Sequence, residues 1–427
     1  MYRKIMGFLK AWKENEHRKP LILQGARQVG KTYSILEFGR THYENVAYFN
    51  FETNPKLNKT FEENISPDYL IPILSHIAGQ TIVTEKTLIV FDEVQLCERA
   101  LTSLKYFCED APDYHIIVAG SLLSVAVGRA KFSFPVGKVD MKTLYPMDME
   151  EFMLALGEND LVEQIKESFQ TDTPLPSALH DAAMQLYRQY LVVGGMPECV
   201  MQFAETKDYI LVRHTQDTIL VSYLNDMSKY NNLNEIKKTR LAYDNITVQL
   251  SKKNTRFQYK LIKKGGRASE FENAIEWLCL SGIVSRVYKV EQIKKPLENY
   301  RDIDAFKIYV SDLGLLCAKK DLAANDILYM VEEINDFKGG MAENYVNVQL
   351  SINIYYTYYW ESEVDFIIQR DGQLIPIEVK SADNTRAKSL KVYMDTYKPA
   401  YAIKLSTKNF GFEDNKKIVP LYAAFCI

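Results

Sequence analysis

Short apolar runs alternate with stretches of helical apolar spacing through the first third of the chain, a pattern typical of strands and helices in alternation. The runs are continuous, which favours strands that are buried on both faces of a sheet. They cover residues 21–23, 46–51, 87–91 and 115–119. Residues 5–12 and 33–38 carry the apolar spacing of helices. This part is therefore predicted to be an α/β fold.

The middle of the chain changes pattern near Asp148. Apolar positions follow helical spacing to about Tyr230, and the pair Gly194-Gly195 ends one of these helices. Farther on, a helix-rich stretch precedes two segments of apolar alternation, 283–290 and 305–310. Two strands after helices is the order of elements in a winged helix.

Two apolar strands near the C-terminus meet at Asp371-Gly372, a pair that favours the tight turn of a β-hairpin. A helix over 342–350 is predicted before the hairpin. A helix over 386–397 and a final strand over 400–404 are predicted after it. The C-terminal part is therefore predicted to be a second α/β region.

Composition narrows the classes of protein that remain. The 427 residues are enough for two to four domains, and 47% hydrophobic with 25% charged residues is typical of a globular chain. The net charge of -3 argues against a surface that coats nucleic acid or anionic membrane throughout. The six cysteines are far apart, and no apolar stretch has the pattern of a secretion signal or a bilayer span. We therefore expect a reduced, cytoplasmic protein without a membrane partner.

The first apolar run leads into a glycine-bounded loop with the spacing G-x-x-x-x-G-K-[ST], in which backbone N–H groups surround phosphate oxygens. Lys31 is expected to reach the β- and γ-phosphates, and the hydroxyl of Thr32 to hold Mg²⁺. A helix that starts at the loop adds its partial positive charge. The expected ATP contacts are Gly25, Ala26, Arg27, Gln28, Val29, Gly30, Lys31 and Thr32.

Two carboxylates, Asp92 and Glu93, directly follow the apolar run 87–91. Downstream of a phosphate loop, Asp92 is expected to support the Mg²⁺ of bound ATP and Glu93 to polarise the attacking water. The alternative is a pair of acids that only contacts solvent.

Two further candidates follow the run 115–119. Ser121 is a candidate for sensing the γ-phosphate or holding the water, and the alternative is a cap on the next helix. Arg129 is a candidate for a charge-stabilising arginine that acts on the nucleotide of a neighbouring subunit in an oligomer. The alternative for Arg129 is an ordinary surface arginine.

With these motifs the chain resembles a prokaryotic family of AAA-type P-loop ATPases whose C-terminal domain is usually labelled uncharacterised. The resemblance rests on the phosphate loop, on Asp92-Glu93-Val94-Gln95, on Gly120-Ser121 and on segments 134–140, 144–152, 194–198 and 306–316. It implies an AAA-type three-layer α/β sandwich with a helical lid. We expect an ATPase domain over 1–150, a helical lid or linker over 151–230, a winged-helix-like domain over 231–320 and the C-terminal domain over 335–427.

Seven basic residues and no acid occupy the stretch from Lys252 to Arg267, with Phe257 and Tyr259 between them. In a chain of negative net charge, this stretch is a candidate for contacting nucleic-acid phosphates. Glutamates in the helix that follows argue against base-specific reading by that helix. The alternative is a solvated basic surface that contacts another part of this protein.

Four residues with the chemistry of a metal-dependent nuclease lie in the C-terminal part. Asp365 opens the first hairpin strand, Glu378 and Lys380 share one face of the second, and Glu343 lies in the preceding helix. The order of helix, hairpin, helix and strand resembles the PD-(D/E)XK, or restriction-endonuclease-like, fold. The resemblance implies Mg²⁺ on the three carboxylates and Lys380 stabilising phosphorane charge or positioning water. The alternatives are a structural ion-pair network and a binding module that cleaves nothing.

The sequence therefore predicts an ATP-hydrolysing AAA-type protein coupled to a nuclease-like domain that acts on or binds nucleic acid. Two other hypotheses stay open. One is a non-catalytic nucleotide switch that recruits a protein partner through its C-terminal domain. The other is an ATP-driven remodeller of proteins that works as a nucleotide-dependent ring.

Overall fold

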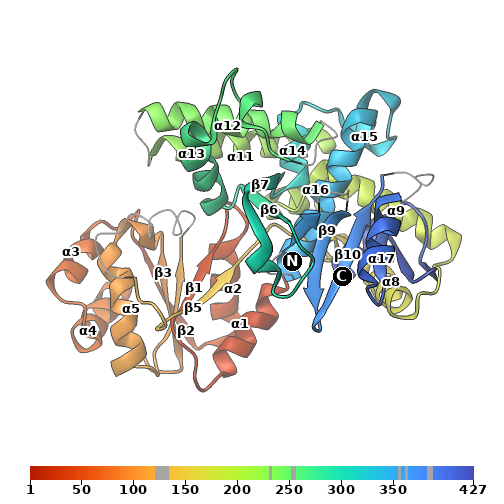
Figure 1. Cartoon of the computed structure of the whole chain (residues 1–427). Coiled ribbons are helices and arrows are strands. Elements are labelled where there is room, and N and C mark those ends of the chain that lie inside the picture. Colours follow the sequence, from red (N-terminus) through yellow and green to blue (C-terminus); the bar gives the residue numbers. More distant parts are fainter. Residues whose placement is uncertain (121–133, 230–232, 252–255, 354–356, 361–363, 382–387) are drawn as a thin grey trace. The chain divides into compact units, whose positions relative to one another are not determined.

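The computed structural model describes residues 1–120, 134–229, 233–251, 256–353, 357–360, 364–381 and 388–427. The chain divides into two compact units (Figure 1). The N-terminal unit comprises Arg3–Tyr145 with Leu280–Gly282. The C-terminal unit comprises Met1–Tyr2, Pro146–Cys279 and Ile283–Ile427.

A five-stranded parallel sheet forms the centre of the N-terminal unit, which confirms the predicted α/β fold. The strands lie in the order β2-β3-β4-β1-β5. They are β1 (Leu21–Gln24), β2 (Asn45–Asn50), β3 (Thr87–Asp92), β4 (His115–Ala119) and β5 (Asp140–Thr143). The four predicted strands are all present, whereas β5 was missed because this edge strand is polar and only partly buried.

Helices cover both faces of this sheet, with α3, α4 and α5 on one face and α1 and α2 on the other (Figure 1). They are α1 (Ile5–Glu14), α2 (Lys31–His42), α3 (Lys56–Glu63), α4 (Pro67–Ala78) and α5 (Glu98–Asp110), with a 3-10 turn, η1 (Val94–Leu96). Phe51, Phe61 and Phe91 pack against one another with ring centroids 5.5 to 5.9 Å apart. Burying each ring contributes about 1.5–3 kcal/mol, which holds the helices on the strand that ends in Asp92.

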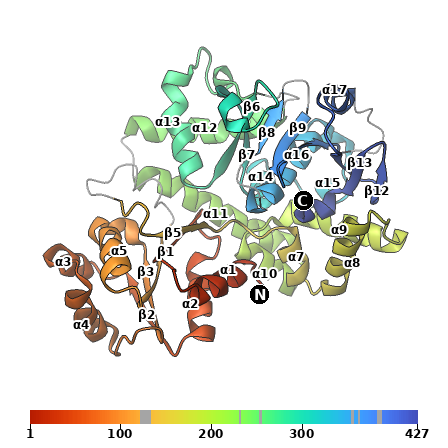
Figure 2. The same ribbon diagram turned by 60° about the horizontal axis from the view of Figure 1, so that its bottom comes forward.

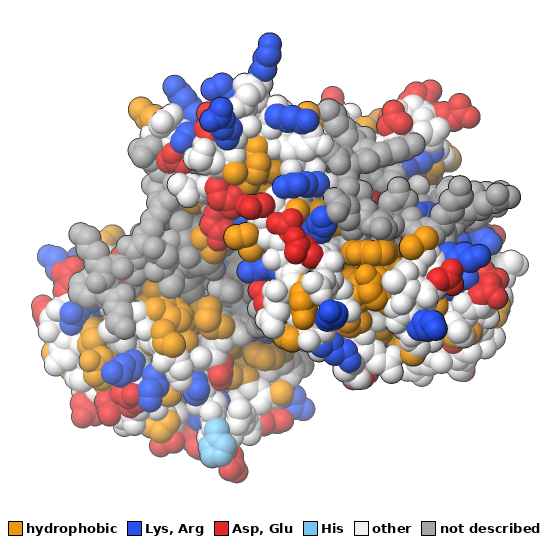
Figure 3. All heavy atoms as spheres, in the orientation of Figure 1, with side chains coloured by type: hydrophobic (Ala, Val, Ile, Leu, Met, Phe, Trp, Pro, Cys, Tyr) orange, Lys and Arg blue, Asp and Glu red, His pale blue; other side chains and the backbone are white. Residues whose placement is uncertain are grey.

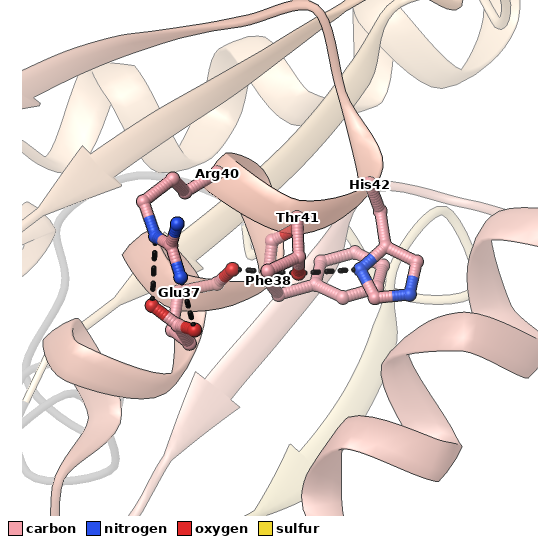
Figure 4. Close-up of polar contacts among 5 residues, drawn as sticks. All are labelled: Glu37, Phe38, Arg40, Thr41 and His42. Atoms are coloured by element: carbon pink, nitrogen blue, oxygen red, sulfur yellow. Dashed lines mark hydrogen bonds and ion pairs between the residues drawn. The ribbon is translucent and has the colours of Figure 1, made fainter.

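Local contacts stabilise the end of α2 that is far from the phosphate loop (Figure 4). Arg40 donates to both carboxylate oxygens of Glu37, at 2.7 and 3.1 Å, and Thr41 Oγ1 donates to the Glu37 carbonyl at 2.8 Å. Basic residues in the last helical turn also complement the helix dipole. Because the ion pair is exposed, its effect is small, and the helix depends mainly on its buried face.

An eight-stranded mixed sheet runs through the C-terminal unit in the order β12-β13-β11-β10-β9-β8-β6-β7. Its strands are β6 (Val284–Val290), β7 (Arg301–Val310), β8 (Tyr358–Trp360), β9 (Val364–Arg370), β10 (Gln373–Val379), β11 (Ala402–Ser406), β12 (Gly411–Glu413) and β13 (Lys416–Pro420). The two strands expected in the middle of the sequence, β6 and β7, therefore continue the sheet that contains the C-terminal hairpin.

The predicted hairpin is confirmed, because Arg370 on β9 pairs with Gln373 on β10 across a two-residue turn. Asp371 and Gly372 have φ angles of 47° and 72°, which is the left-handed backbone that such a turn requires. The strand predicted over 400–404 is present as β11, but the prediction that it is the final strand was wrong. Two short strands with several charged residues, β12 and β13, follow it.

The other elements of the C-terminal unit are helical, as predicted for the region from Asp148 to Tyr230. Before β6 lie α7 (Met149–Ala155), α8 (Asn159–Thr171), α9 (Ser177–Val193), α10 (Pro197–Thr206), α11 (Tyr209–Lys229), α12 (Leu233–Ser251), η2 (Tyr259–Leu261) and α13 (Ala268–Leu280). After it lie η3 (Leu297–Tyr300), α14 (Leu313–Lys319), α15 (Ala324–Leu328), η4 (Glu332–Ile334), α16 (Asn335–Asn353), α17 (Lys388–Tyr397) and η5 (Leu421–Cys426). Helix α16 packs on β7 and β10 (Figure 2).

Candidate functional site

The phosphate-loop residues form a tight turn between β1 and α2. Gly25, Gln28 and Gly30 have φ angles of 142°, 64° and 90°. A Cβ atom on Gly25 would lie 2.1 Å from the carbonyl oxygen of Leu144, so the loop requires glycine there. The turn ends at Gly30, and Lys31 begins the helix, as the expected anion site at a helix N-terminus requires.

Side chains of the loop divide into buried and exposed groups. Ala26 and Val29 are buried, Arg27 is half-buried and Gln28 is exposed. The guanidinium of Arg3 donates to the Val29 carbonyl at 2.9 Å and to the Tyr145 carbonyl at 2.8 Å. Sequence reasoning missed Arg3, because nothing in a local pattern links it to a loop 26 residues away. Through these two hydrogen bonds, Arg3 fixes the backbone of the phosphate loop at Val29.

The ammonium group of Lys31 lies on the loop itself. Its Nζ donates to the carbonyl oxygens of Gly25 at 2.9 Å and Ala26 at 2.7 Å, and the residue is 8% exposed. Neutral carbonyls are weaker partners for a cation than phosphate oxygens. The lysine is therefore held next to the loop by bonds that an anion can replace.

Thr32, at the start of α2, and Asp92, at the end of β3, meet although β4 lies between β3 and the strand β1 that leads into α2. Thr32 Oγ1 donates to Asp92 Oδ2 at 2.9 Å, and the hydroxyl of Tyr48 donates to the same oxygen at 2.7 Å. A hydroxyl and a carboxylate are hard oxygen ligands, so this pair fits Mg²⁺. Burial, the largest cause, and the Asp92 carboxylate raise the pKa of Tyr48 to about 12, so the phenol stays a donor. The sequence pattern did not identify Tyr48, which stands on the neighbouring strand β2.

Glu93 has a left-handed backbone with a φ angle of 52°, an unfavourable conformation for a side chain of this size. Its carboxylate accepts a hydrogen bond from Gln95 Nε2. Burial is the main cause that raises the pKa of Glu93, and the neighbouring Asp92 adds to it. A carboxylate with a raised pKa is a stronger base. The other two candidates of this unit, Ser121 and Arg129, lie outside the described residues.

In the C-terminal unit the structure brings together the residues that the sequence singled out. Asp365 on β9 and Glu378 on β10 lie opposite each other on the two hairpin strands, next to the paired residues Phe366 and Ile377. Val379 N–H donates to Asp365 Oδ2 at 2.8 Å. Lys380 Nζ lies 3.0 Å from Glu378 Oε1, and Glu343 faces the strands from α16.

A lysine that sequence reasoning missed lies among these carboxylates. Lys307, on β7, places its Nζ 3.1 Å from Glu343 Oε2 and 3.7 Å from Asp365 Oδ1. The hydroxyl of Tyr309 also donates to Glu343 Oε2, at 3.1 Å. Burial lowers the pKa of Lys307, but Glu343 and Asp365 outweigh it and the net effect is a raised pKa. The ammonium group is therefore charged at neutral pH.

The same contacts affect the acids. Burial, and after it the Glu343 carboxylate, raise the pKa of Asp365 to about 7. Glu378 is 1% exposed, and its Oε2 has no hydrogen-bond partner in the described part of the chain. Among the residues that the structure describes, no group of three or more His, Cys, Asp or Glu side chains is placed to hold a metal ion. The geometry here does not fit the Mg²⁺ site expected from Glu343, Asp365 and Glu378.

The basic stretch is exposed where the structure describes it, and Lys252 and Lys253 lie outside that part. Lys and Arg side chains gather over the region of α12 and α13 (Figure 3). Phe257, however, is buried and stacks on Phe306 with ring centroids 5.3 Å apart, and the Tyr259 hydroxyl donates to Glu272. The Phe257 ring is therefore part of the interior, and the half-buried Tyr259 ring packs edge-on against it with ring centroids 5.1 Å apart, so neither ring is free to stack on bases. The exposed basic residues are Arg256, Lys260, Lys263, Lys264 and Arg267.

None of the helices in the described ranges is both long enough and apolar enough to span a bilayer.

Three family models match successive parts of the chain. An AAA domain matches residues 17–153, a domain of unknown function (DUF8612) matches 184–326, and a second domain of unknown function (DUF4143) matches 338–424. The first match supports an AAA-type ATPase domain in the N-terminal part of the chain. No curated protein matches the chain.

Several solved structures resemble parts of this chain at low identity. The Walker-type ATPase PABY2304 of Pyrococcus abyssi is 14% identical over 75% of this chain and 95% of its own, with a TM-score of 0.45. The ORC2 protein of Aeropyrum pernix is 11% identical over 78% and 94%, with a TM-score of 0.36. The RuvB Holliday junction branch migration motor of Thermotoga maritima is 13% identical over 66% and 88%, with a TM-score of 0.29. TM-scores this low leave the likenesses too weak to assign a function.

Proposed function

We propose that the protein binds ATP with Mg²⁺ at the loop from Gly25 to Thr32 and hydrolyses it. The observation that carries this proposal is the hydrogen bond of 2.9 Å between Thr32 and Asp92, which places the two expected oxygen ligands together. A bound Mg²⁺ would supply charge neutralisation at the phosphates, and Thr32 and Asp92 would hold it. Tyr48 keeps Asp92 oriented through its own bond to Oδ2.

The remaining residues have separate roles in the proposed reaction. Lys31 exchanges its bonds to the Gly25 and Ala26 carbonyls for bonds to the β- and γ-phosphates. Glu93 accepts a proton from, or orients, the attacking water, and its raised pKa favours this role. Ser121 and Arg129 stay candidates for sensing the γ-phosphate and for stabilising charge in an oligomer.

For the C-terminal unit we propose a restriction-endonuclease-like core that binds nucleic acid, preceded by a winged-helix-like segment. The order α16, β9, β10, α17 and β11 supports the first part, with β10 parallel to β11. The helices α12 and α13 followed by the antiparallel pair β6 and β7 support the second. The exposed basic side chains between α12 and α13 supply the positive surface.

Binding without cleavage is the form of this proposal that one observation favours. Lys307 lies between Glu343 and Asp365, where a catalytic metal would have to bind. Two glutamates of α13 are paired with Arg286, at 2.7 Å for Glu272 and 3.3 Å for Glu276. Their repulsion of a phosphate backbone is thereby reduced.

ATP hydrolysis by the purified protein tests the first part of the proposal. We expect Glu93→Gln to lower turnover by about 10²–10⁴-fold while ATP binding is kept, because only the proton acceptor is lost. Lys31→Ala should lose ATP binding as well, since the phosphates lose their cation. Lys59→Ala, an exposed lysine on α3, is the matched control and should behave as wild type. Full turnover in Lys31→Ala would refute the assignment.

Binding of labelled single- and double-stranded DNA and RNA by the purified protein tests the proposal that the C-terminal unit binds nucleic acid. We expect a Lys263→Glu, Lys264→Glu variant to bind more weakly, with a reduced salt dependence, because two phosphate contacts are replaced by repulsion. Lys416→Glu is the control, since it reverses charge on the far strand β13. Binding that is equal in all three proteins, or absent in wild type, would contradict the proposal. Cleavage that requires Mg²⁺ and Glu378 would instead identify a nuclease.

A further inference from the structure

A lysine occupies the space between the two carboxylates that a divalent cation would bridge. Lys307 Nζ lies 3.1 Å from Glu343 Oε2 and 3.7 Å from Asp365 Oδ1, and the side chain is 7% exposed. A Mg²⁺ ion in this gap would need the carboxylate oxygens at about 2.0–2.1 Å, with no other cation beside it. The ammonium group and the metal therefore exclude each other.

The surroundings of Lys307 keep it in this position. Its Nζ is 5.2 Å from the centroid of the Tyr359 ring, a cation–π contact that adds to the two ionic contacts. Glu343 Oε2 also accepts from Tyr309, and Asp365 Oδ2 accepts from the backbone of Val379. Both acids thus use protein donors in addition to the lysine. Withdrawing the ammonium would leave the buried Asp365 and the partly buried Glu343 without their nearest counter-charge, which is costly.

The charge balance agrees with this arrangement. Glu343, Asp365 and Glu378 with Lys307 and Lys380 have a formal charge of -1 when all five groups are ionised. Without Lys307 the formal charge would be -2, which one divalent cation would neutralise. Glu378 Oε2, a buried acceptor without a hydrogen-bond partner among the described residues, is a single oxygen, which can accept a donor but cannot chelate.

We propose that Lys307 is a built-in cation that takes the place of a divalent metal in the C-terminal unit. The site of Glu343, Asp365 and Glu378 is then assembled without metal, and whatever the unit binds there is bound without metal. This inference stands whether or not the N-terminal unit hydrolyses ATP.

Binding of Mn²⁺ to the full chain tests the inference, with the loss of the free Mn²⁺ signal in electron paramagnetic resonance as the readout. All proteins carry Asp92→Asn and contain no nucleotide, so that the phosphate-loop site does not contribute. The four proteins compared are this background alone, with Asp365→Asn, with Lys307→Met, and with both changes. Circular dichroism establishes which of them are folded.

We expect the background and its Asp365→Asn variant to bind the same amount of Mn²⁺. Lys307→Met should gain a site at least tenfold tighter than any in the double variant, because it alone combines free carboxylates with room for a metal. A Mn²⁺ site in the background that Asp365→Asn removes would overturn the inference, as would a folded Lys307→Met without a new site. If Lys307→Met does not fold, the first two proteins, which keep Lys307, still decide between the outcomes.

Discussion

Each unit of this protein contains a buried lysine beside groups that suit a phosphate or a metal, and the two lysines have different partners. Lys31 contacts the neutral carbonyl oxygens of Gly25 and Ala26. Lys307 contacts the carboxylates of Glu343 and Asp365. A bond to a carbonyl is easily exchanged for a bond to phosphate, whereas a buried pair of opposite charges resists separation. The partner of the lysine, more than the lysine itself, therefore decides whether a site is ready for a ligand.

The largest expected effect is on the free energy of unfolding when each lysine in turn is replaced by methionine. Lys307→Met should lower the free energy of unfolding by about 3–5 kcal/mol, because it removes the nearest counter-charge of the buried Asp365 and the partly buried Glu343. Lys31→Met should lower it by less, about 1 kcal/mol, because the hydrogen-bond acceptors that it loses contact with, the Gly25 and Ala26 carbonyls, are neutral and Glu93 is only partly buried. Urea denaturation of both variants, followed by circular dichroism, measures the two changes.

Adding Glu343→Gln to Lys307→Met provides the control, since it removes one of the unpaired charges. The double variant should recover part of the lost stability. Equal destabilisation by the two single lysine changes would show that the charge of the partner does not matter, and the comparison would fail.

The pH dependence of unfolding gives a smaller test that concerns the C-terminal site alone. The pKa of Asp365 is raised to about 7, whereas an aspartate in an unfolded chain has a pKa of about 3.9. Between these values the native protein holds a proton that the unfolded chain has lost, so this group makes unfolding easier as pH rises from about 4 to 7. Asp365→Asn should remove that part of the slope.

The measurement is the difference in unfolding free energy between wild type and Asp365→Asn at several pH values. Taking the difference cancels other buried acids, such as Asp312, whose pKa burial raises to about 6. If that difference is constant from pH 4 to 7, Asp365 is ionised in the native protein throughout this range. Lys307 would then stabilise the charged form of Asp365 more strongly than a pKa of about 7 implies.

Sequence reasoning found the parts of both sites whose signals are local. The phosphate loop, the strand that ends in Asp92 and the hairpin turn at Asp371-Gly372 each depend on residues within a few positions of one another. The alternation that predicted β6 and β7 is equally local. These elements form as expected because their backbone requirements and buried faces agree.

The residues that sequence reasoning missed act over long separations. Lys307 meets Glu343 across 36 residues, and Tyr48 meets Asp92 across 44. A lysine in an apolar strand gives no sign of its partner, because strand order and register decide which side chains face each other. The metal set expected in the C-terminal part had the right acids, but a pattern of acids does not reveal a cation that comes from another strand.

The position of Lys307 also bears on how this protein can change in evolution. Lys307 belongs to the segment matched by one family model, residues 184–326, whereas Glu343, Asp365 and Glu378 belong to the segment matched by the next, 338–424. The eight-stranded sheet also contains strands from both segments, since β6 of the first segment pairs with β8 of the second. A recombination event that transferred 338–424 alone would separate two carboxylates from their cation and a sheet from its two end strands. We therefore expect the C-terminal unit to be destabilised by such a transfer unless Lys307 and the strands β6 and β7 are transferred with it.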